Sequence, residues 1–148
     1  MSEKLRNNVL GVILDEDNNV LIVSRANDPL HWQFPQGGVH DDEPEEQAIV
    51  RELSEELGTD AFEIITRCPE KHSYRWSENL IRDEHVGQEQ NIFILRFTGN
   101  SKDISLDQRE LGGFLWVAPA QVSIFLHEYR QPVWSIARNH IPPQSESV

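Results

Sequence analysis

Three glutamates stand close together in a segment that reads GGVHDDEPEEQAIVRELSEELGT from Gly37 to Thr59: Glu52, Glu55 and Glu56. On a helix, residues three or four positions apart share a face, so these carboxylates would form one acidic stripe. Like charges at this spacing repel one another, and Glu55 and Glu56 would also face the negative end of the helix dipole. A divalent cation would offset both effects, and hard oxygen ligands suit Mg²⁺ or Mn²⁺. The stripe therefore predicts a metal site, with a solvated acidic surface as the alternative.

A helix from about Glu43 to Leu57 is expected to position this stripe. Asp42 is expected to cap its N-terminus and Glu45 to complete a capping box, while Pro44 suits the first turn, where its missing N–H costs little. Gly58 stands where a helix commonly ends in the left-handed conformation. At about 100° per residue the apolar side chains fall on one face, which should be buried. That face consists of Ile49, Val50, Leu53 and Leu57.

The spacing of these residues resembles the signature of the Nudix hydrolase family over its full length. Gly37 is followed after five residues by Glu43, and after seven more by a run from Arg51 to Gly58 that reads RELSEELG. One position departs, because Thr59 stands where the family usually has an aliphatic residue. The resemblance implies an α/β fold, the Nudix-type α/β/α sandwich with a mixed β-sheet. It also implies hydrolysis of a phosphoanhydride bond in a nucleoside diphosphate that is linked to another group.

The resemblance assigns ligands to the metal, which would be Mg²⁺ with Mn²⁺ as a possible substitute. The ligands would be the carboxylates of Glu52, Glu55 and Glu56 and the backbone carbonyl of Gly37. Arg51 would pair with Glu43 or Glu55 and so orient the carboxylates around the ion. An ordinary surface ion pair is the alternative for Arg51.

The general base implied by the resemblance is a glutamate, and two positions qualify. Glu56 belongs to the signature itself. Glu110 opens the segment ELGGFLWV at 110–117, which is similar to the segment of bacterial RNA 5′-pyrophosphohydrolases that contributes a late metal-binding glutamate. The implied catalytic residues are therefore Arg51, Glu55, Glu56 and Glu110, and Glu110 also joins the metal ligands.

Segments outside the signature resemble the subgroup that hydrolyses diadenosine tetraphosphate and triphosphorylated RNA 5′ ends. They are the lead-in WQFPQGG at 32–38, the stretch GQEQ at 87–90 and the N-terminal RNNV at 6–9. Tyr74 falls where this subgroup stacks a base, an interaction worth ~1–3 kcal/mol, and a packed loop aromatic is the alternative. The substrate-binding residues implied are Arg6, Gln36, Tyr74, Arg75, Gln88 and Gln90.

Two substrates of this subgroup would undergo the same chemistry. One is the 5′ triphosphate of an RNA, cut to a monophosphate, and the other is a dinucleoside polyphosphate, cut asymmetrically. The matching segments favour RNA, whereas the net charge of −12 favours a small dinucleotide. A catalytically silent nucleotide-binding sensor is an alternative of another class, and the complete set of signature glutamates argues against it.

Composition narrows the class of protein. The 148 residues suffice for one domain spanning 1–148, with 142–148 expected to be a disordered tail. No apolar run approaches the roughly 20 residues of a membrane span, and the lone cysteine, Cys68, fits a reducing cytoplasm. The charge of −12 argues against binding of duplex DNA. The expected partner is a nucleotide or an RNA 5′ end, and the oligomeric state stays open.

One region reverses the acidic balance of the chain. Residues 67–82 hold four cations against two acids, and they also carry Tyr74 and Trp76. A strand–loop excursion through residue 88 is expected here, and loops of this length are often functional. The excursion is expected to receive the nucleotide, with Lys71 or Arg75 contacting phosphates.

The rest of the chain predicts strands followed by helical pieces. A hairpin is expected from the apolar runs 8–14 and 20–24, which flank the turn DEDNN. Trp32 and Phe34 alternate as in a strand with one packed face. Further strands are expected at 62–66, 91–97 and 113–117. A helix is expected from Pro119 to Leu126 or beyond, then a break at Pro132 and a last helical piece over 133–140.

Overall fold

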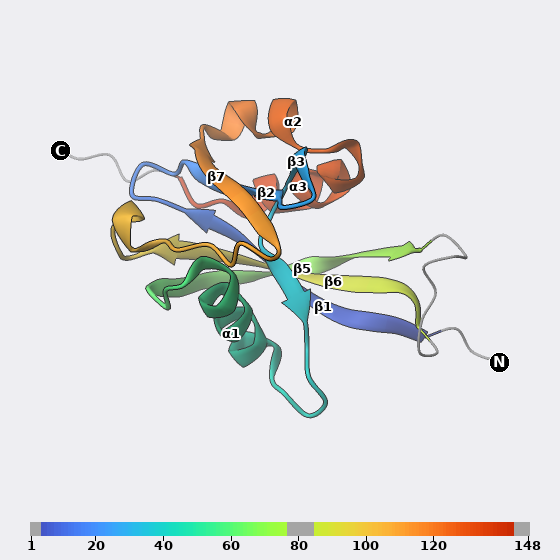
Figure 1. Ribbon diagram of the computed structural model, residues 1–148. Coiled ribbons are helices and arrows are strands. Elements are labelled where there is room, and N and C mark those ends of the chain that lie inside the picture. Colours follow the sequence, from blue (N-terminus) through green and yellow to red (C-terminus); the bar gives the residue numbers. More distant parts are fainter. Residues whose placement is uncertain (1–3, 77–84, 144–148) are drawn as a thin grey trace.

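A mixed β-sheet lies at the centre of the computed structural model, which describes residues 4–76 and 85–143 (Figure 1). The strand order is β3-β2-β1-β6-β5, while β4 pairs with β1 and β7 pairs with β2. The pairing of β1 with β6 is parallel and the other pairings are antiparallel. The strands are β1 (Lys4–Leu14), β2 (Val20–Arg25), β3 (Asp28–Gln33), β4 (Gln36–Gly38), β5 (Phe62–Arg75), β6 (His85–Phe97) and β7 (Leu111–Val117).

Helices cover the sheet on both faces, so the described residues form the expected α/β/α sandwich (Figure 1). On one side lies α1 (Glu45–Leu57), and on the other lie the short helices α2 (Val122–Phe125) and α3 (Gln131–Ala137). Single 3₁₀ turns accompany them at Ser101–Asp103, Pro119–Gln121, Glu128–Arg130 and Arg138–His140.

The central strands are apolar on both faces because each face is covered. Successive side chains of β1 point to opposite sides of the sheet. Val9 and Ile13 pack with the apolar face of α1, whereas Leu10 and Val12 pack with Trp134 of α3. This double burial explains why the run 8–14 reads as continuously apolar rather than alternating.

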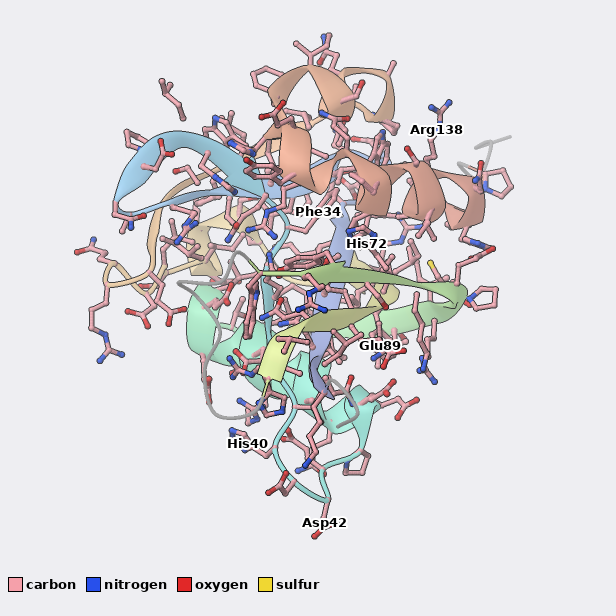
Figure 2. The ribbon with its side chains drawn as sticks, turned by 90° about the vertical axis from the view of Figure 1, so that its right-hand side faces the viewer. Phe34, His40, Asp42, His72, Glu89 and Arg138 are labelled. Carbon is pink, nitrogen blue, oxygen red and sulfur yellow. The ribbon has the colours of Figure 1, made fainter. Side chains whose placement is uncertain are left out.

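The helix that carries the glutamates begins later than expected. Pro44 occupies the N-cap without a side-chain bond, and Asp42 lies in a left-handed turn with φ of 61° at the tip of the loop (Figure 2). The predicted Asp42 cap is therefore wrong. Glu43 takes the local role instead, because its carboxylate turns back to accept the His40 N–H at 3.0 Å. At the other end Gly58 has φ of 69°, which confirms the left-handed stop.

The expected short strand at 62–66 and the loop after it are instead one long hairpin. β5 continues to Arg75 and pairs with β6 as far as the Arg75–Gly87 register. Two irregularities interrupt the pairing, and the exposed and half-buried side chains along β5 are mostly polar. That polarity hid the strand, because one face of the hairpin borders a polar cavity rather than the core. Arg82, which belonged to the predicted basic region, lies outside the described residues.

In the C-terminal region the structure differs from the prediction at two places. Pro132 lies in the first turn of α3 rather than breaking a helix, because a first-turn N–H has no partner within the helix. The helix expected from Pro119 is only a 3₁₀ turn followed by α2, and it ends at Phe125. Arg138 projects outward from the last turn (Figure 2). Of the predicted tail, Pro142 and Pro143 are described, and no helix in the described residues is long and apolar enough to span a bilayer.

Candidate active site

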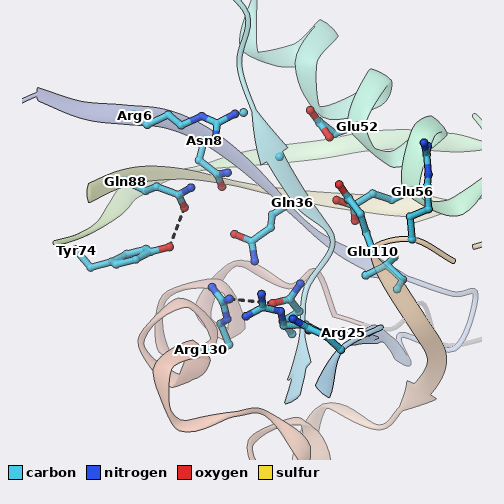
Figure 3. A pocket seen from close by; sticks show the side chains of 16 residues that line it. Arg6, Asn8, Arg25, Gln36, Glu52, Glu56, Tyr74, Gln88, Glu110 and Arg130 are labelled. Atoms are coloured by element: carbon cyan, nitrogen blue, oxygen red, sulfur yellow. Dashed lines mark hydrogen bonds between the residues drawn. The ribbon is translucent and has the colours of Figure 1, made fainter. Parts of the chain in front are cut away.

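A cavity of about 610 Å³ opens where β4, the last turns of α1 and the β5–β6 hairpin meet (Figure 3). Residues from at least six elements line it, and almost all of them are polar or charged. One wall carries the carboxylates of Glu52, Glu56 and Glu110. The remaining walls carry four arginines and several amide side chains. The cavity therefore offers negative and positive charge to the same ligand.

Glu56 is the most perturbed group in the carboxylate wall. Its side chain comes from α1 but lies beside the cavity, and the residue is only 6% exposed. Burial, together with the nearby charges of Glu110 and Glu52, raises the pKa of Glu56 to about 9. Burial also raises the pKa of Glu52, although the Arg51 guanidinium opposes the change. Without a counter-charge, the protonated form of Glu56 is therefore favoured.

The residues of this wall fit a divalent cation by their chemistry. Glu56 Oε2 is buried and has no hydrogen-bond partner among the described residues, which leaves a hard oxygen acceptor unsatisfied. Carboxylate oxygens of this kind are the ligands that Mg²⁺ and Mn²⁺ prefer. Among the described side chains, however, no three acids, histidines or cysteines converge closely enough to hold an ion as they stand. A cation would therefore have to draw the carboxylates together.

Two adjacent glycines allow opposite charges to approach the backbone of β4. A Cβ at Gly37 would lie 2.0 Å from Cδ of Glu52, and a Cβ at Gly38 would lie 2.3 Å from Nη2 of Arg6. Neither position could hold a side chain without moving its charged neighbour. The Gly37-Gly38 pair thus brings the Glu52 carboxylate of α1 and the Arg6 guanidinium of β1 to adjoining stretches of main chain.

Arg51 lies behind the carboxylate wall and connects its parts. Its Nε and Nη2 donate to the two oxygens of Glu43 at 2.8 and 2.9 Å, and Nη2 also donates to the Gly38 carbonyl at 2.8 Å. Its Nη1 donates to Glu52 at 2.8 Å, whereas Glu55 lies at 3.5 Å and is largely exposed. The guanidinium lowers the pKa of Glu43 to about 2, helped by the His40 N–H. The expected pairing with Glu43 is present, and it anchors the start of α1 to β4.

Except at Arg6, the positive charge in the cavity comes from residues that the sequence did not indicate. Four arginines line it: Arg6, Arg25, Arg109 and Arg130. From the predicted basic region, Arg67 instead pairs with Glu45 at 2.7 Å, and Lys71 pairs with Glu89 at 3.4 Å. Arg75 is exposed on β5 and does not line the cavity. The sequence pattern missed Arg25, Arg109 and Arg130 because these arginines are scattered over the chain and meet only in the fold.

The β5–β6 hairpin supplies a ring and a layer of amides. The Tyr74 hydroxyl donates to Gln88 Oε1 at 2.8 Å, and both side chains line the cavity (Figure 3). Gln90 lies beneath this surface, only 1% exposed, and donates to Gln36 Oε1 at 2.6 Å. Gln36 Nε2 has no partner among the described residues although it is buried. Gln90 thus orients Gln36, whose free amide hydrogens can meet a ligand.

The structure brings most of the predicted site residues together. Those that line the cavity are Arg6, Gln36, Gly37, Glu52, Glu56, Tyr74, Gln88 and Glu110. Arg51 and Gln90 support this set from behind, whereas Glu55 and Arg75 point elsewhere. The lining residues that were not among the predicted site residues are Asn8, Arg25, Asn27, Gln33, Gly38, Arg109, Leu111 and Arg130. Arg109 could have been suspected, because it directly precedes Glu110.

Comparisons with known proteins agree with this fold. The model of the family described as NUDIX domain matches residues 4–139. A protein named RNA pyrophosphohydrolase from Ectopseudomonas mendocina is 35% identical over 150 residues, covering 92% of this chain and 94% of the relative. A second protein of that name, from Acidiphilium cryptum, is 31% identical and covers 87% and 85%. The solved Ap4A hydrolase of C. elegans in a binary complex superposes with a TM-score of 0.71 at 17% identity, covering 92% and 97%.

Proposed function

Because the chain belongs to the Nudix hydrolase family, and is therefore a pyrophosphohydrolase of phosphoanhydride bonds, we propose that its substrate is triphosphorylated RNA. Water would attack a phosphorus of the 5′ triphosphate, the phosphoanhydride bond would break, and pyrophosphate would leave a 5′ monophosphate. One observation carries this proposal: the cavity presents both negatively and positively charged side chains. Its carboxylate wall suits the reacting phosphates with their metal, and its other walls suit the nucleotide.

Members of this family generally depend on a divalent metal, and we propose Mg²⁺, with Mn²⁺ as a substitute. Glu52, Glu56 and the Gly37 carbonyl would hold it, with Glu110 and a reoriented Glu55 completing the set. When bound, the ion would neutralise charge on the phosphates and supply an activated water. The orphaned Glu56 oxygen supports this assignment, since an unpaired buried acceptor otherwise costs about 1–3 kcal/mol.

The protein groups have separate tasks in this proposal. Arg51 holds Glu52 and Glu43, so the wall keeps its shape when phosphates enter. Glu110, which is exposed at the edge of the cavity, is better placed than buried Glu56 to accept a proton from the attacking water. Tyr74 would stack the first base, and Arg6 would meet the phosphate charge near Gly38.

The reducing cytoplasm remains the compartment that the lone cysteine favours.

A dinucleoside polyphosphate is the second candidate substrate, and the net charge of −12 is the observation in its favour. Long RNA would be repelled by an acidic surface beyond the cavity, whereas a dinucleotide would not. Against this, four arginines line the cavity itself, so the local potential differs from the overall charge. The relatives named RNA pyrophosphohydrolase span most of the chain, which supports RNA as the first choice.

A side-by-side rate comparison tests the proposal. Initial rates are measured with Mg²⁺ on 5′-triphosphorylated RNA and on diadenosine tetraphosphate, with product identity determined by chromatography. A higher kcat/KM on RNA with release of pyrophosphate supports the first choice, and the reverse ranking favours the dinucleotide. Binding of both ligands without any product would indicate a nucleotide sensor instead.

A further inference from the structure

Arg130 reaches the cavity from a region that the family signature does not include. It ends the 3₁₀ turn Glu128–Arg130, just before α3, and its guanidinium lines the cavity. Figure 3 places it across the cavity from Glu52 and Glu56, with Gln36 between them. Arg130 therefore faces the part of a ligand that lies away from the carboxylate wall.

Three groups fix this guanidinium. Its Nε donates to Nε2 of His31 at 3.2 Å, and its Nη2 donates to Oε1 of Gln33 at 2.9 Å. The hydroxyl of Tyr74 also interacts with it. A guanidinium has five N–H donors, and these contacts use at most three of them. Within the described residues, two donors therefore remain for a ligand in the cavity.

The charges around Arg130 favour an anionic ligand. Burial lowers the pKa of the Arg130 guanidinium, and Arg25 is close enough to disfavour its charge as well. Neither arginine forms an ion pair with a carboxylate of the described residues, and both line the same cavity. Two cations held near one another without a counter-charge are stabilised when an anion binds between them.

His31 supports Arg130 as a hydrogen-bond acceptor. It lies on β3, is 6% exposed, and stacks on His127 with ring centroids 4.1 Å apart. Because Nε2 accepts from Arg130, the ring is neutral with its hydrogen on Nδ1. The adjoining main chains are also joined, since His127 N donates to the Trp32 carbonyl at 3.1 Å. The imidazole is thus a fixed support rather than a mobile surface group.

We propose that Arg130 binds a substrate phosphate remote from the cleaved bond, and that neutral His31 is the positioning residue that aims the guanidinium into the cavity. This proposal rests on the proposed function, and it adds a binding group contributed by the C-terminal region. Bidentate binding of phosphate by arginine is strong and directional, so loss of the fork should weaken binding more than it slows chemistry.

Steady-state kinetics on 5′-triphosphorylated RNA of two or more nucleotides test the role of Arg130. Arg130→Ala is expected to raise KM about 10- to 150-fold, which corresponds to loss of a hydrogen bond to a charged group, while kcat changes less than about threefold. Arg130→Lys keeps the charge without the fork and should give an intermediate KM. Arg138→Ala removes an exposed arginine from the same region and serves as the matched control, with unchanged constants.

His31 is tested by rescue. His31→Leu removes the acceptor and should raise KM as Arg130→Ala does, whereas His31→Gln keeps an acceptor oxygen and should restore KM to within about threefold of the wild type. Adding His31→Leu to Arg130→Ala should raise KM no further, because both act through one guanidinium. Should the alanine variant lose its fold in a thermal melt, Arg130→Lys carries the same test.

Two results would overturn the proposal. An active wild type with an unchanged KM in Arg130→Ala would exclude Arg130 as a phosphate ligand, just as an unchanged KM in Arg130→Lys would exclude its bidentate contact, and the proposed function would stay intact. Full additivity of His31→Leu and Arg130→Ala would exclude the positioning role of His31. Absence of hydrolysis by the wild type itself would instead overturn the proposed function.

Discussion

At the scale of single residues, Glu56 is a carboxyl that the fold holds in an unfavourable state. Burial, together with the charges of Glu110 and Glu52, raises its pKa to about 9, and its Oε2 finds no partner among the described residues. A group whose folded-state pKa exceeds its unfolded value stabilises the fold at low pH, and this stability is lost as pH rises from about 4.5 through 9. The folded protein is therefore less stable at neutral pH than at low pH unless a cation compensates the charge.

The substitution Glu56→Gln tests both parts of this description. Loss of a metal ligand should lower kcat by about 10²- to 10⁴-fold. In EDTA the variant should melt at or above the wild-type temperature, and the difference should grow from pH 5 to pH 9. Thermal melts at several pH values and steady-state rates with Mg²⁺ supply the measurements. Retained activity would refute the metal site, and a variant less stable than the wild type at pH 9 would refute the burial of an unpaired charge.

Tyr74 is expected to contribute binding rather than chemistry. Tyr74→Ala should raise KM by about 5- to 150-fold on both RNA and dinucleotide with little change in kcat, because stacking acts equally in the ground and transition states. Tyr74→Phe keeps the ring but loses the hydroxyl contacts with Gln88 and Arg130, so its KM should rise much less than that of Tyr74→Ala. Tyr129→Ala removes a tyrosine that is 72% exposed and serves as the control. A lower Tm of Tyr74→Ala with an unchanged KM would show that the ring belongs to the core.

At the scale of elements, the segment before and within α1 was the best predicted part of the molecule. Its apolar face and its left-handed stop at Gly58 could be derived from local spacing, because a helix converts sequence distance directly into position. The Arg51–Glu43 pair was instead one of two pairings that the resemblance to the family implied. The predicted Asp42 cap was wrong because Glu43 lies in the turn before the helix and not, as expected, at the first helical position. The full length of the β5–β6 hairpin was not predicted, because its polar face borders the cavity and its sequence therefore lacks the alternation typical of a half-buried strand.

Residues that meet only through the sheet could not be predicted from local patterns. Arg25 and Arg130 come from β2 and from the turn before α3, and no spacing rule relates them. Most of the carboxylate wall was foreseen, whereas most of the cationic lining was not. The reason is physical, since one helix carries Glu52 and Glu56, while each arginine stands on a different element.

The close contact between β4 and α1 gives a prediction at this scale. Gly37→Ala would place a Cβ 2.0 Å from Cδ of Glu52, so the carboxylate must move away from the wall. A misplacement of about 1 Å can cost about 10²-fold in rate, and a loss of that order in kcat is expected. Gly113→Ala is the matched control, because its nearest contact would be an ordinary 3.6 Å to Ser24 Oγ. Circular dichroism should show both variants folded, and an unimpaired Gly37→Ala would contradict the close fit.

At the scale of the whole molecule, the cavity joins both helical layers to the sheet. Glu52 and Glu56 come from the α1 side, Arg130 from the opposite layer, and Tyr74 from the hairpin. A ligand in the cavity would thus contact most parts of the fold at once, and anything that binds only the folded state raises its stability.

Metal binding should therefore be visible in the global stability. Millimolar Mg²⁺ or Mn²⁺ should raise Tm by several degrees, since a ligand at 100 times its Kd adds about 2.7 kcal/mol. The increase should be larger at pH 8.5 than at pH 6, because binding must displace the proton of Glu56. Melts with Mg²⁺ and with EDTA measure it, and Glu52→Gln is the control with a reduced response. An identical Tm in both conditions, for wild type and control alike, would contradict the metal site.

The parallel pairing of β1 with β6 bears on how the chain folds during translation. Lys4 pairs with His85 and Leu14 with Arg96, whereas β1 and β2 share only the Leu14–Val20 register. β1 must therefore wait until the chain has been synthesised through β6 before its main partner is present. Contacts this distant in sequence slow folding, and an unpaired apolar strand edge can pair with other chains meanwhile. We therefore expect chaperones to protect the nascent chain until β6 has emerged. Only then can β1 and β6 come together, and both strands line the cavity.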